Sequence, residues 1–147
     1  MITLTGIARK KSSRSPMQEL TSSSVSTESG LEGDFRGKPG KRQLTILSQE
    51  AWQQACTEIG TELDWTTRRA NLFLTGISFC PQDVGKILEI GDVRLQITRE
   101  TDPCKRMDEA QQGLKTALVP DWRGGICCQV LSAGIISVGD KVRIHEA

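Results

Sequence analysis

KILEIGDVRLQIT, residues 86–98, is the stretch of sequence that decides the fold class of this chain. Apolar and polar side chains alternate on each side of Gly91-Asp92, and a period of two residues is typical of a strand with one buried face. A glycine followed by one further residue favours a two-residue hairpin turn. The stretch therefore predicts strands over residues 86–90 and 93–98 that pair as an antiparallel hairpin.

Similar short apolar runs occur along the whole chain, separated by Gly, Pro and Ser residues. This punctuation is typical of many short strands. Residues 9–29 are polar and favour either a flexible loop or strands with polar faces, whereas the glycines within residues 30–40 predict a loop. Further strands are expected over residues 1–8, 43–47, 70–75, 125–131 and 141–144.

Two segments have helical spacing instead. Ser48 is expected to cap a helix whose apolar stripe begins at Ala51 and which ends at Gly60. A second helix is expected over residues 108–118, although Gly113 weakens it. Seven or eight strands with two helices predict a mainly β fold, either a barrel or a sandwich, with helical insertions.

Length and composition exclude several classes of protein. With 147 residues, of which 37% are hydrophobic and 25% charged, the chain is expected to form one ordered domain over residues 1–147. It contains no apolar run of about 18 residues, so no membrane span is expected. The basic cluster follows the first apolar stretch, which is the reverse of a secretory signal, so a cytoplasmic location is expected.

The distribution of charge indicates the kind of ligand. A net charge of +1 argues against a general nucleic-acid binder. Residues 1–42, however, contain eight Lys and Arg against four Asp and Glu, whereas residues 43–147 contain eleven against fourteen. A local basic focus in a nearly neutral protein favours a compact anionic ligand.

The cysteines do not form a recognisable framework. Their number is odd and their spacing irregular, and without an export signal this argues against disulfide bonds. There is no Cys-x-x-Cys motif and only one histidine, so neither a structural zinc site nor histidine-based acid–base catalysis is expected. The five cysteines are Cys56, Cys80, Cys104, Cys127 and Cys128.

Two basic loops have the chemistry of a phosphate site. Glycine lets backbone N–H groups approach an anion, Arg side chains pair with phosphate oxygens, and serine hydroxyls add donors. A basic loop taken alone is nevertheless more often a solvated surface than a site. The chain has no P-loop motif, which argues against that type of nucleotide site. The first loop contains Arg9, Lys10, Lys11 and Arg14, and the second contains Arg36, Lys38, Lys41 and Arg42.

Two further segments are candidates for anion binding. Arg68, Arg69 and Asn71 stand at the start of an expected strand, where a barrel offers side chains to a ligand at its mouth. An ordinary ion pair at a strand edge is an equally good interpretation of these residues. Arg123 precedes two glycines and has the reach to contact an anion, but the same sequence is also compatible with a tight turn.

The segment from residue 98 to residue 107 carries the sharpest local signal. Cys104 follows Pro103 at the start of an expected helix and precedes Lys105 and Arg106. The helix dipole and the two cations are expected to favour the thiolate form of Cys104. A thiolate is both a nucleophile and a soft metal ligand. Although a cysteine is more often a small buried hydrophobe, these flanks make Cys104 the expected catalytic or metal-binding residue.

A series of short segments extends across most of the chain in a specific order. They are GLEGD (30–34), RG (36–37), Arg42, RANL (69–72), TG (75–76), LEIGDV (88–93), DPCKR (102–106), WRGG (122–125), VLSAG (130–134) and VGDKV (138–142). Each segment alone is a weak signal, and their order makes the match specific. Together they resemble the MOSC family, which is named for the C-terminal domain of molybdenum cofactor sulfurase.

This resemblance implies a β-barrel related to that of pyruvate kinase. It also implies a site for the molybdenum cofactor, molybdopterin, which is a phosphate-bearing pterin dithiolene that holds a molybdenum atom. Cys104 would then ligate molybdenum or, as proposed for cofactor-sulfurating members, carry sulfur, and Arg69 and Asn71 would belong to the cofactor pocket. The family as a whole is also associated with pyridoxal phosphate binding. The implied partners are a cysteine desulfurase, a molybdoenzyme apoprotein or an electron-transfer protein.

Three functions remain open at this point. The first is a molybdenum-cofactor-binding accessory domain that acts in cofactor maturation, sulfuration or sulfur delivery. The second is a small molybdenum-dependent reductase of N-hydroxylated compounds, and the third is a plain anion-binding module without a cofactor. In the first two, the residues expected to bind the cofactor are Arg9, Lys10, Lys11, Arg36, Arg42, Arg69, Asn71, Arg106 and Arg123.

Overall fold

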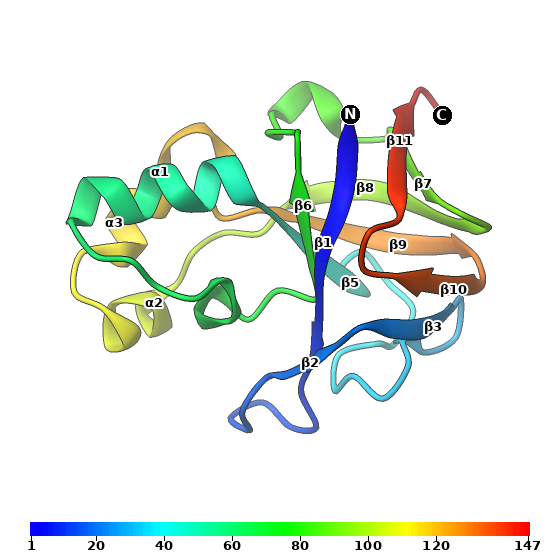
Figure 1. Cartoon of the computed structure of the whole chain (residues 1–147), viewed down its shortest axis with the longest axis horizontal. Coiled ribbons are helices and arrows are strands. Elements are labelled where there is room, and N and C mark those ends of the chain that lie inside the picture. The colour runs from blue at the N-terminus through cyan, green and yellow to red at the C-terminus, as the bar shows by residue number, and fades with distance from the viewer.

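The computed structural model describes residues 1–147 and contains a closed β-barrel (Figure 1). The strands of its sheet are β1 (Ile2–Arg9), β2 (Gln18–Leu20), β5 (Leu44–Ser48), β6 (Leu72–Thr75), β7 (Ile87–Ile90), β8 (Val93–Glu100), β9 (Ile126–Ser132) and β11 (Lys141–His145). Seven of them pair in the order β11-β7-β8-β9-β5-β6-β1, and β1 pairs in turn with β11, which closes the ring. Only β5 and β6 are parallel neighbours in the ring, and β2 extends the sheet beyond β1.

Strands β7 and β8 form the hairpin that the sequence predicts. Ile90 pairs with Val93 across the turn, and Gly91 has the positive φ, 59°, that a two-residue turn requires. Leu88 and Leu95 are paired residues of the two strands and are fully buried. The alternation in the sequence therefore corresponds to one face of the hairpin packed inside the barrel.

A second, three-stranded sheet packs against the barrel. Its strands are β3 (Ser22–Ser26), β4 (Gly30–Leu31) and β10 (Gly134–Ser137), in the order β10-β3-β4. Val25 and Ile136 are buried and join the apolar cluster of the barrel. Part of the polar segment 9–29 thus forms strands with polar faces, and residues 10–17 form a loop between β1 and β2.

The three α-helices lie together on one side of the barrel (Figure 1). The longest is α1 (Gln49–Ile59), in which the hydroxyl of Ser48 accepts a hydrogen bond from the N–H of Ala51 at 3.2 Å. Gly60 ends α1 in the left-handed conformation, with a φ of 69°, as expected from the sequence. None of the helices combines the length and the apolar composition that crossing a bilayer requires.

The prediction of a single helix over residues 108–118 is wrong. The structure has two shorter helices there, α2 (Lys105–Ala110) and α3 (Leu114–Leu118). Gln111 is extended, and Gly113 has a φ of 89°, so the backbone leaves the helical region between them. The low helix propensity of glycine therefore breaks the segment rather than merely weakening it.

Two apolar clusters account for the core. One cluster of 19 buried apolar residues, mostly aliphatic, fills the barrel and extends to the three-stranded sheet, and a second cluster of 12 lies between the barrel and the helices. In the second cluster the rings of Trp65 and Phe73 stack with their centres 5.0 Å apart. Because side chains fill the barrel, a ligand has to bind at its rim or on the loops.

Candidate functional site

One small pocket is lined only by polar and charged side chains, and we call it the inner pocket. It lies where the end of β1 and the starts of β5 and β6 meet the loop between β4 and β5. Four of the lining residues are cations and one is a carboxylate, so the pocket is positively charged. The lining consists of Lys10, Asp34, Arg36, Arg42, Thr45, Arg69 and Asn71.

Asp34 organises the inner pocket through the backbone. Its Oδ1 accepts a hydrogen bond from the N–H of Lys10 at 3.0 Å, and its Oδ2 accepts one from the N–H of Arg36 at 3.2 Å. The carboxylate therefore ties the β4–β5 loop to the end of β1. None of the four cations forms an ion pair, which leaves their charge available to a ligand.

Lys10 is half-buried among like charges. Its pKa is lowered to about 8, first by burial and then by the positive charges of Arg69 and Arg36. The charge of Asp34 opposes this shift but does not compensate for it. Because a nearby anion favours the charged form of a lysine, an anionic ligand in the inner pocket would restore the ammonium charge.

Arg69 has two unusual features. It follows the short 3-10 helix η1 (Trp65–Arg68) in a left-handed backbone conformation, with a φ of 66°. Its Nη2 donates a hydrogen bond to the carbonyl of Ser15 at 2.6 Å, whereas its buried Nε has no hydrogen-bond partner. A buried donor without a partner costs about 1–3 kcal/mol. A strained backbone and an unpaired donor in one residue are typical of a binding site.

Asn71 and Thr45 lie at the buried side of the inner pocket. The Oδ1 of Asn71 accepts a hydrogen bond from the N–H of Thr45 at 3.0 Å, and its Nδ2 donates one to the carbonyl of Ala8 at 3.2 Å. Asn71 thereby links β5 and β1 at the start of β6. Its amide carries a second hydrogen that makes no hydrogen bond within the protein.

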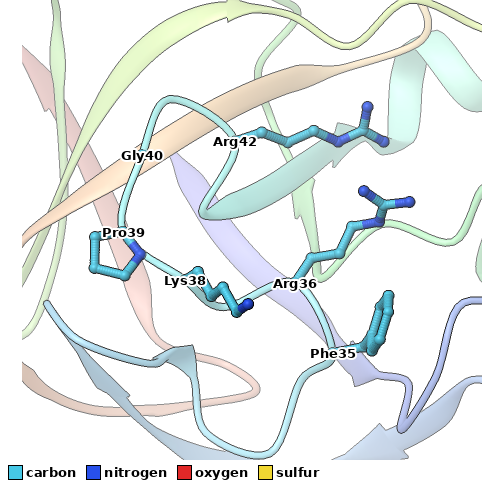
Figure 2. Close-up of a pocket in the computed structure, with 6 residues that line it drawn as sticks. All are labelled: Phe35, Arg36, Lys38, Pro39, Gly40 and Arg42. Atoms are coloured by element: carbon cyan, nitrogen blue, oxygen red, sulfur yellow. The ribbon is translucent and has the colours of Figure 1, made fainter.

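Arg36 and Arg42 also line a more open pocket, which we call the outer pocket. Figure 2 shows both guanidinium groups extending in the same direction from the β4–β5 loop, with the ring of Phe35 beside Arg36. The Cζ of Arg36 lies 6.0 Å from the centre of that ring. Only glycine fits at residue 37, because a Cβ there would lie 1.7 Å from the carbonyl oxygen of Ser29. The tight loop therefore presents two guanidinium groups side by side.

Three further predicted residues lie around the inner pocket without lining it. Arg9 donates from Nη1 to the carbonyl of Glu32 at 2.8 Å. Lys11 is exposed and its side chain makes no hydrogen bond or ion pair. Arg106 donates from Nη1 to the carbonyl of Ser13 at 2.9 Å, which places it against the loop of residues 10–17.

Arg123 lies in another part of the molecule. It is 5% exposed, forms an ion pair with Glu58 of α1, and donates from Nη1 to the carbonyl of Ala117 in α3 at 3.0 Å. Its Nε is buried and has no partner. The structure does not bring Arg123 into the inner pocket, and its place in a cofactor site stays a prediction.

Cys104 is exposed and is the N-cap residue of α2. The buried guanidinium of Arg68 donates to the carbonyls of Thr101 and Gly124, both at 2.9 Å, and so fastens the loop that carries Cys104. The pKa of Arg68 is lowered to about 10, mainly by burial and then by the charge of Arg42, whereas an ionised Cys104 raises it. Cys104 and Arg42 are therefore both within electrostatic reach of one buried guanidinium.

Sequence reasoning missed Asp34 and Thr45, and it placed Arg68 beside Arg69 at the mouth of the barrel, whereas the structure buries Arg68. Arg68 has the same residue type and neighbourhood as Arg69, so nothing in the sequence indicates that one is a buried strut and the other lines a pocket. For Asp34, a carboxylate at the start of a basic loop was the available signal. Thr45 carries no signal, because it becomes relevant only through its hydrogen bond to Asn71.

Residues 29–143 of the sequence match the family described as MOSC domain. The chain belongs to the MOSC domain family. This match confirms the resemblance drawn from the short segments, and it includes the β4–β5 loop, Arg69, Asn71 and Cys104.

Solved structures share the fold of this MOSC domain. The YuaD protein from Bacillus subtilis has a TM-score of 0.80 at 19% identity, over 100% of this chain and 97% of that one. YiiM from Geobacillus stearothermophilus has a TM-score of 0.79 at 17% identity, over 99% of this chain and 76% of that one. YiiM from Escherichia coli has a TM-score of 0.75 at 15% identity, over 99% of this chain and 70% of that one. No curated protein sequence matches the chain. The likeness confirms the predicted fold class, a mainly β MOSC-type barrel with helical insertions.

The MOSC family is associated with the molybdenum cofactor, and the residues of this chain fit such a group. The unpaired cations of the inner pocket and the free Nε of Arg69 suit its phosphate. The exposed thiol of Cys104 suits a soft metal. No group of three or more His, Cys, Asp or Glu side chains is placed to hold a metal ion.

Proposed function

We propose that this MOSC domain binds the molybdenum cofactor in the cytoplasm and acts in its maturation, sulfuration or delivery. The observation that carries the proposal is the inner pocket, where four cations gather without an ion-pair partner. When bound, the cofactor supplies a molybdenum atom that accepts sulfur and exchanges electrons.

The phosphate of the cofactor belongs in the inner pocket under this proposal. The guanidinium groups of Arg36, Arg42 and Arg69 provide planar pairs of donors that match phosphate oxygens. Lys10 adds a point charge, and the second amide hydrogen of Asn71 adds a neutral donor. The residues that fix this geometry, Asp34 among them, act on the backbone and leave the donors free.

Cys104 either ligates molybdenum or carries a sulfur atom. In the second role its thiolate attacks the outer sulfur of a persulfide on a cysteine desulfurase. The sulfur–sulfur bond of the donor breaks as a new one forms on Cys104, and the donor cysteine leaves as a thiolate, so no oxidant or reductant is consumed. Arg68 fastens the loop that carries Cys104 and so holds the exposed thiol in place.

A plain anion-binding module is the second candidate. It is favoured by the anion-binding groups that line the inner pocket, which suit a simple phosphate as well as a phosphate-bearing cofactor. A reductase of N-hydroxylated compounds would use the same residues as the first candidate together with an electron-transfer partner. Its assay becomes informative only once the metal has been found.

Metal and pterin analysis tests the proposal. The protein is purified without oxygen from a host supplied with molybdate, beside Cys104→Ser. Cys80→Ser is the matched control, because Cys80 is the other exposed cysteine and precedes a short 3-10 helix, η2 (Pro81–Asp83). Molybdenum and pterin are expected in stoichiometric amounts in the parent and in Cys80→Ser, and are expected to be lost from Cys104→Ser.

Absence of molybdenum from the parent protein directs the test to sulfur carriage. The protein is then incubated with a cysteine desulfurase and cysteine, and persulfides are labelled on each thiol. A persulfide on Cys104 but not on Cys80 supports the sulfur-carrier role. If neither pterin nor a persulfide is found, the cofactor function is excluded and the plain anion-binding module remains.

A further inference from the structure

A second pocket, which we call the lateral pocket, shares Arg69 with the inner pocket. It lies between the loop of residues 10–17, η1 and α2. Arg69 lines both pockets, so one side chain is within reach of a ligand in either of them. The polar lining of the lateral pocket consists of Arg14, Thr66, Thr67, Arg69, Arg106 and Glu109.

Positive charge is concentrated in the lateral pocket as well. After burial, the charges of Arg106 and Arg14 are the causes that lower the pKa of Arg69. The one carboxylate in the lining is Glu109, which lies 3.8 Å from Arg14. Both side chains of this pair are more than half exposed, at 72% and 55%, so water screens the attraction and the pair is weak. Three guanidinium groups therefore face a single, loosely held carboxylate.

The lateral pocket has hydrogen-bond donors that make no hydrogen bond within the protein. Arg69 and Arg106 both donate to the carbonyl of Ser13, at 3.3 and 2.9 Å, but a guanidinium has five N–H groups. The hydroxyl of Thr67 makes no hydrogen bond within the protein, whereas that of Thr66 is engaged by Asp64. The loop carbonyls thus hold the arginines in place without using up their donors.

We propose that the inner and lateral pockets bind the two phosphoryl groups of one organic diphosphate, with Arg69 in contact with both groups. A monophosphate has one anionic group and fills one pocket, which leaves the charge of the other uncompensated. The planar guanidinium presents donors along more than one edge, so it is suited to bridge two phosphoryl groups. The proposal deepens the proposed function, because it assigns the form of ligand that the same site takes.

Calorimetric titration of the full chain with AMP and ADP tests this proposal. The two probes differ by one phosphoryl group, and they are compared without divalent cations at constant ionic strength. ADP is expected to bind about 10-fold more tightly than AMP or better, as a second charge-assisted contact would give. Inorganic pyrophosphate, run in parallel, shows how much of the affinity the organic part supplies.

Variants assign the second phosphoryl group to the lateral pocket. Arg106→Gln is expected to reduce the ADP advantage to about 3-fold or less and to leave AMP affinity within about 2-fold. Arg14→Gln, at an exposed position, is expected to reduce it in the same direction. Arg36→Gln is expected to weaken both ligands. Arg94→Gln removes one exposed cation from β8, outside both pockets, and is the matched control.

Equal affinity for AMP and ADP overturns the proposal, and so does an ADP advantage that survives in both Arg106→Gln and Arg14→Gln. This failure is distinct from failure of the proposed function. A protein that contains molybdenum and pterin but does not distinguish AMP from ADP retains the function and loses the second subsite. A protein that prefers ADP through Arg106 but contains neither molybdenum nor pterin retains the subsite and loses the cofactor function.

Discussion

Lys10 titrates in a range where an ordinary lysine does not. Its pKa is about 8 in the folded protein, against an ordinary value of 10.5. Between these two values the unfolded chain binds more protons than the folded one, so this group makes the free energy of unfolding rise with pH across that window. Below pH 8 the folded protein carries the buried charge in full, and an anion in the inner pocket offsets its cost.

Binding of sulfate should therefore weaken as the pH rises through 8. Sulfate keeps a constant charge in this range, so Lys10 is the group that titrates. We expect the dissociation constant, measured by calorimetry, to increase about 3- to 10-fold between pH 7 and pH 9. In Lys10→Met, binding should be weaker at pH 7 and nearly independent of pH. The same pH dependence in the variant and the parent would show that another group is responsible.

Arg68 is buried and supports the loop that carries Cys104, so its replacement should lower the stability of the protein. In Arg68→Met the carbonyls of Thr101 and Gly124 lose their donors, and we expect the free energy of unfolding to fall by about 2 kcal/mol. Urea denaturation measures this change. Arg99→Met is the control, because Arg99 is exposed on β8 and should change stability by less than about 0.5 kcal/mol. Equal stability of the two variants would remove the strut role from Arg68.

The start of α1 depends on one hydroxyl with two hydrogen bonds. Ser48 accepts from the N–H of Ala51 at 3.2 Å and donates to the carbonyl of Ile77 at 2.6 Å. Ser48→Ala should therefore lower the free energy of unfolding by about 1–2 kcal/mol, measured in urea. Thr57→Ala, on the exposed face of α1, removes a hydroxyl that bonds only within the helix and should cost less than about 0.5 kcal/mol. A similar loss in both variants would argue against a specific capping effect.

Elements with strong local signals could be predicted from the sequence, and elements without them could not. The Gly91 hairpin and the α1 helix from Ser48 to Gly60 agree with the structure because turn, cap and periodicity all act within a few residues. The pairing of β3 with β10 was not predictable, because Ser22–Ser26 has little apolar alternation and its partner lies far along the chain. The split between α2 and α3 depends on the conformation of Gly113, which composition alone does not set.

The inner pocket is a product of the whole molecule. The types of residue that line it could be predicted, because two basic loops and the arginines before β6 stand out in the sequence. Their meeting could not, since it requires β1 to lie beside β6 and β6 beside β5 in the closed ring. The same long-range pairing places Arg123 among the helices, and the local sequence does not predict this position.

Strand β11 completes the barrel through its pairs with both β7 and β1. Removing residues 141–147 breaks both pairings and exposes the interior next to Val142, so we expect the cooperative urea transition to be lost. Removing only residues 146 and 147, which follow β11, should leave the transition within about 0.5 kcal/mol of the parent. A cooperative transition in the shorter chain would show that the remaining six strands are stable without closure.

Closure of the ring also determines how the protein behaves at high concentration. A strand with unpaired backbone groups is a template for association with other chains, and a closed barrel has no such edges within its ring. The free edges that remain belong to β2, β4 and β10, which have three, two and four residues. Edges this short offer few unpaired backbone groups for edge-to-edge aggregation. The chain should therefore remain dispersed while the ring is closed and become prone to aggregate once β11 detaches and uncovers the edge of β7 and the start of β1.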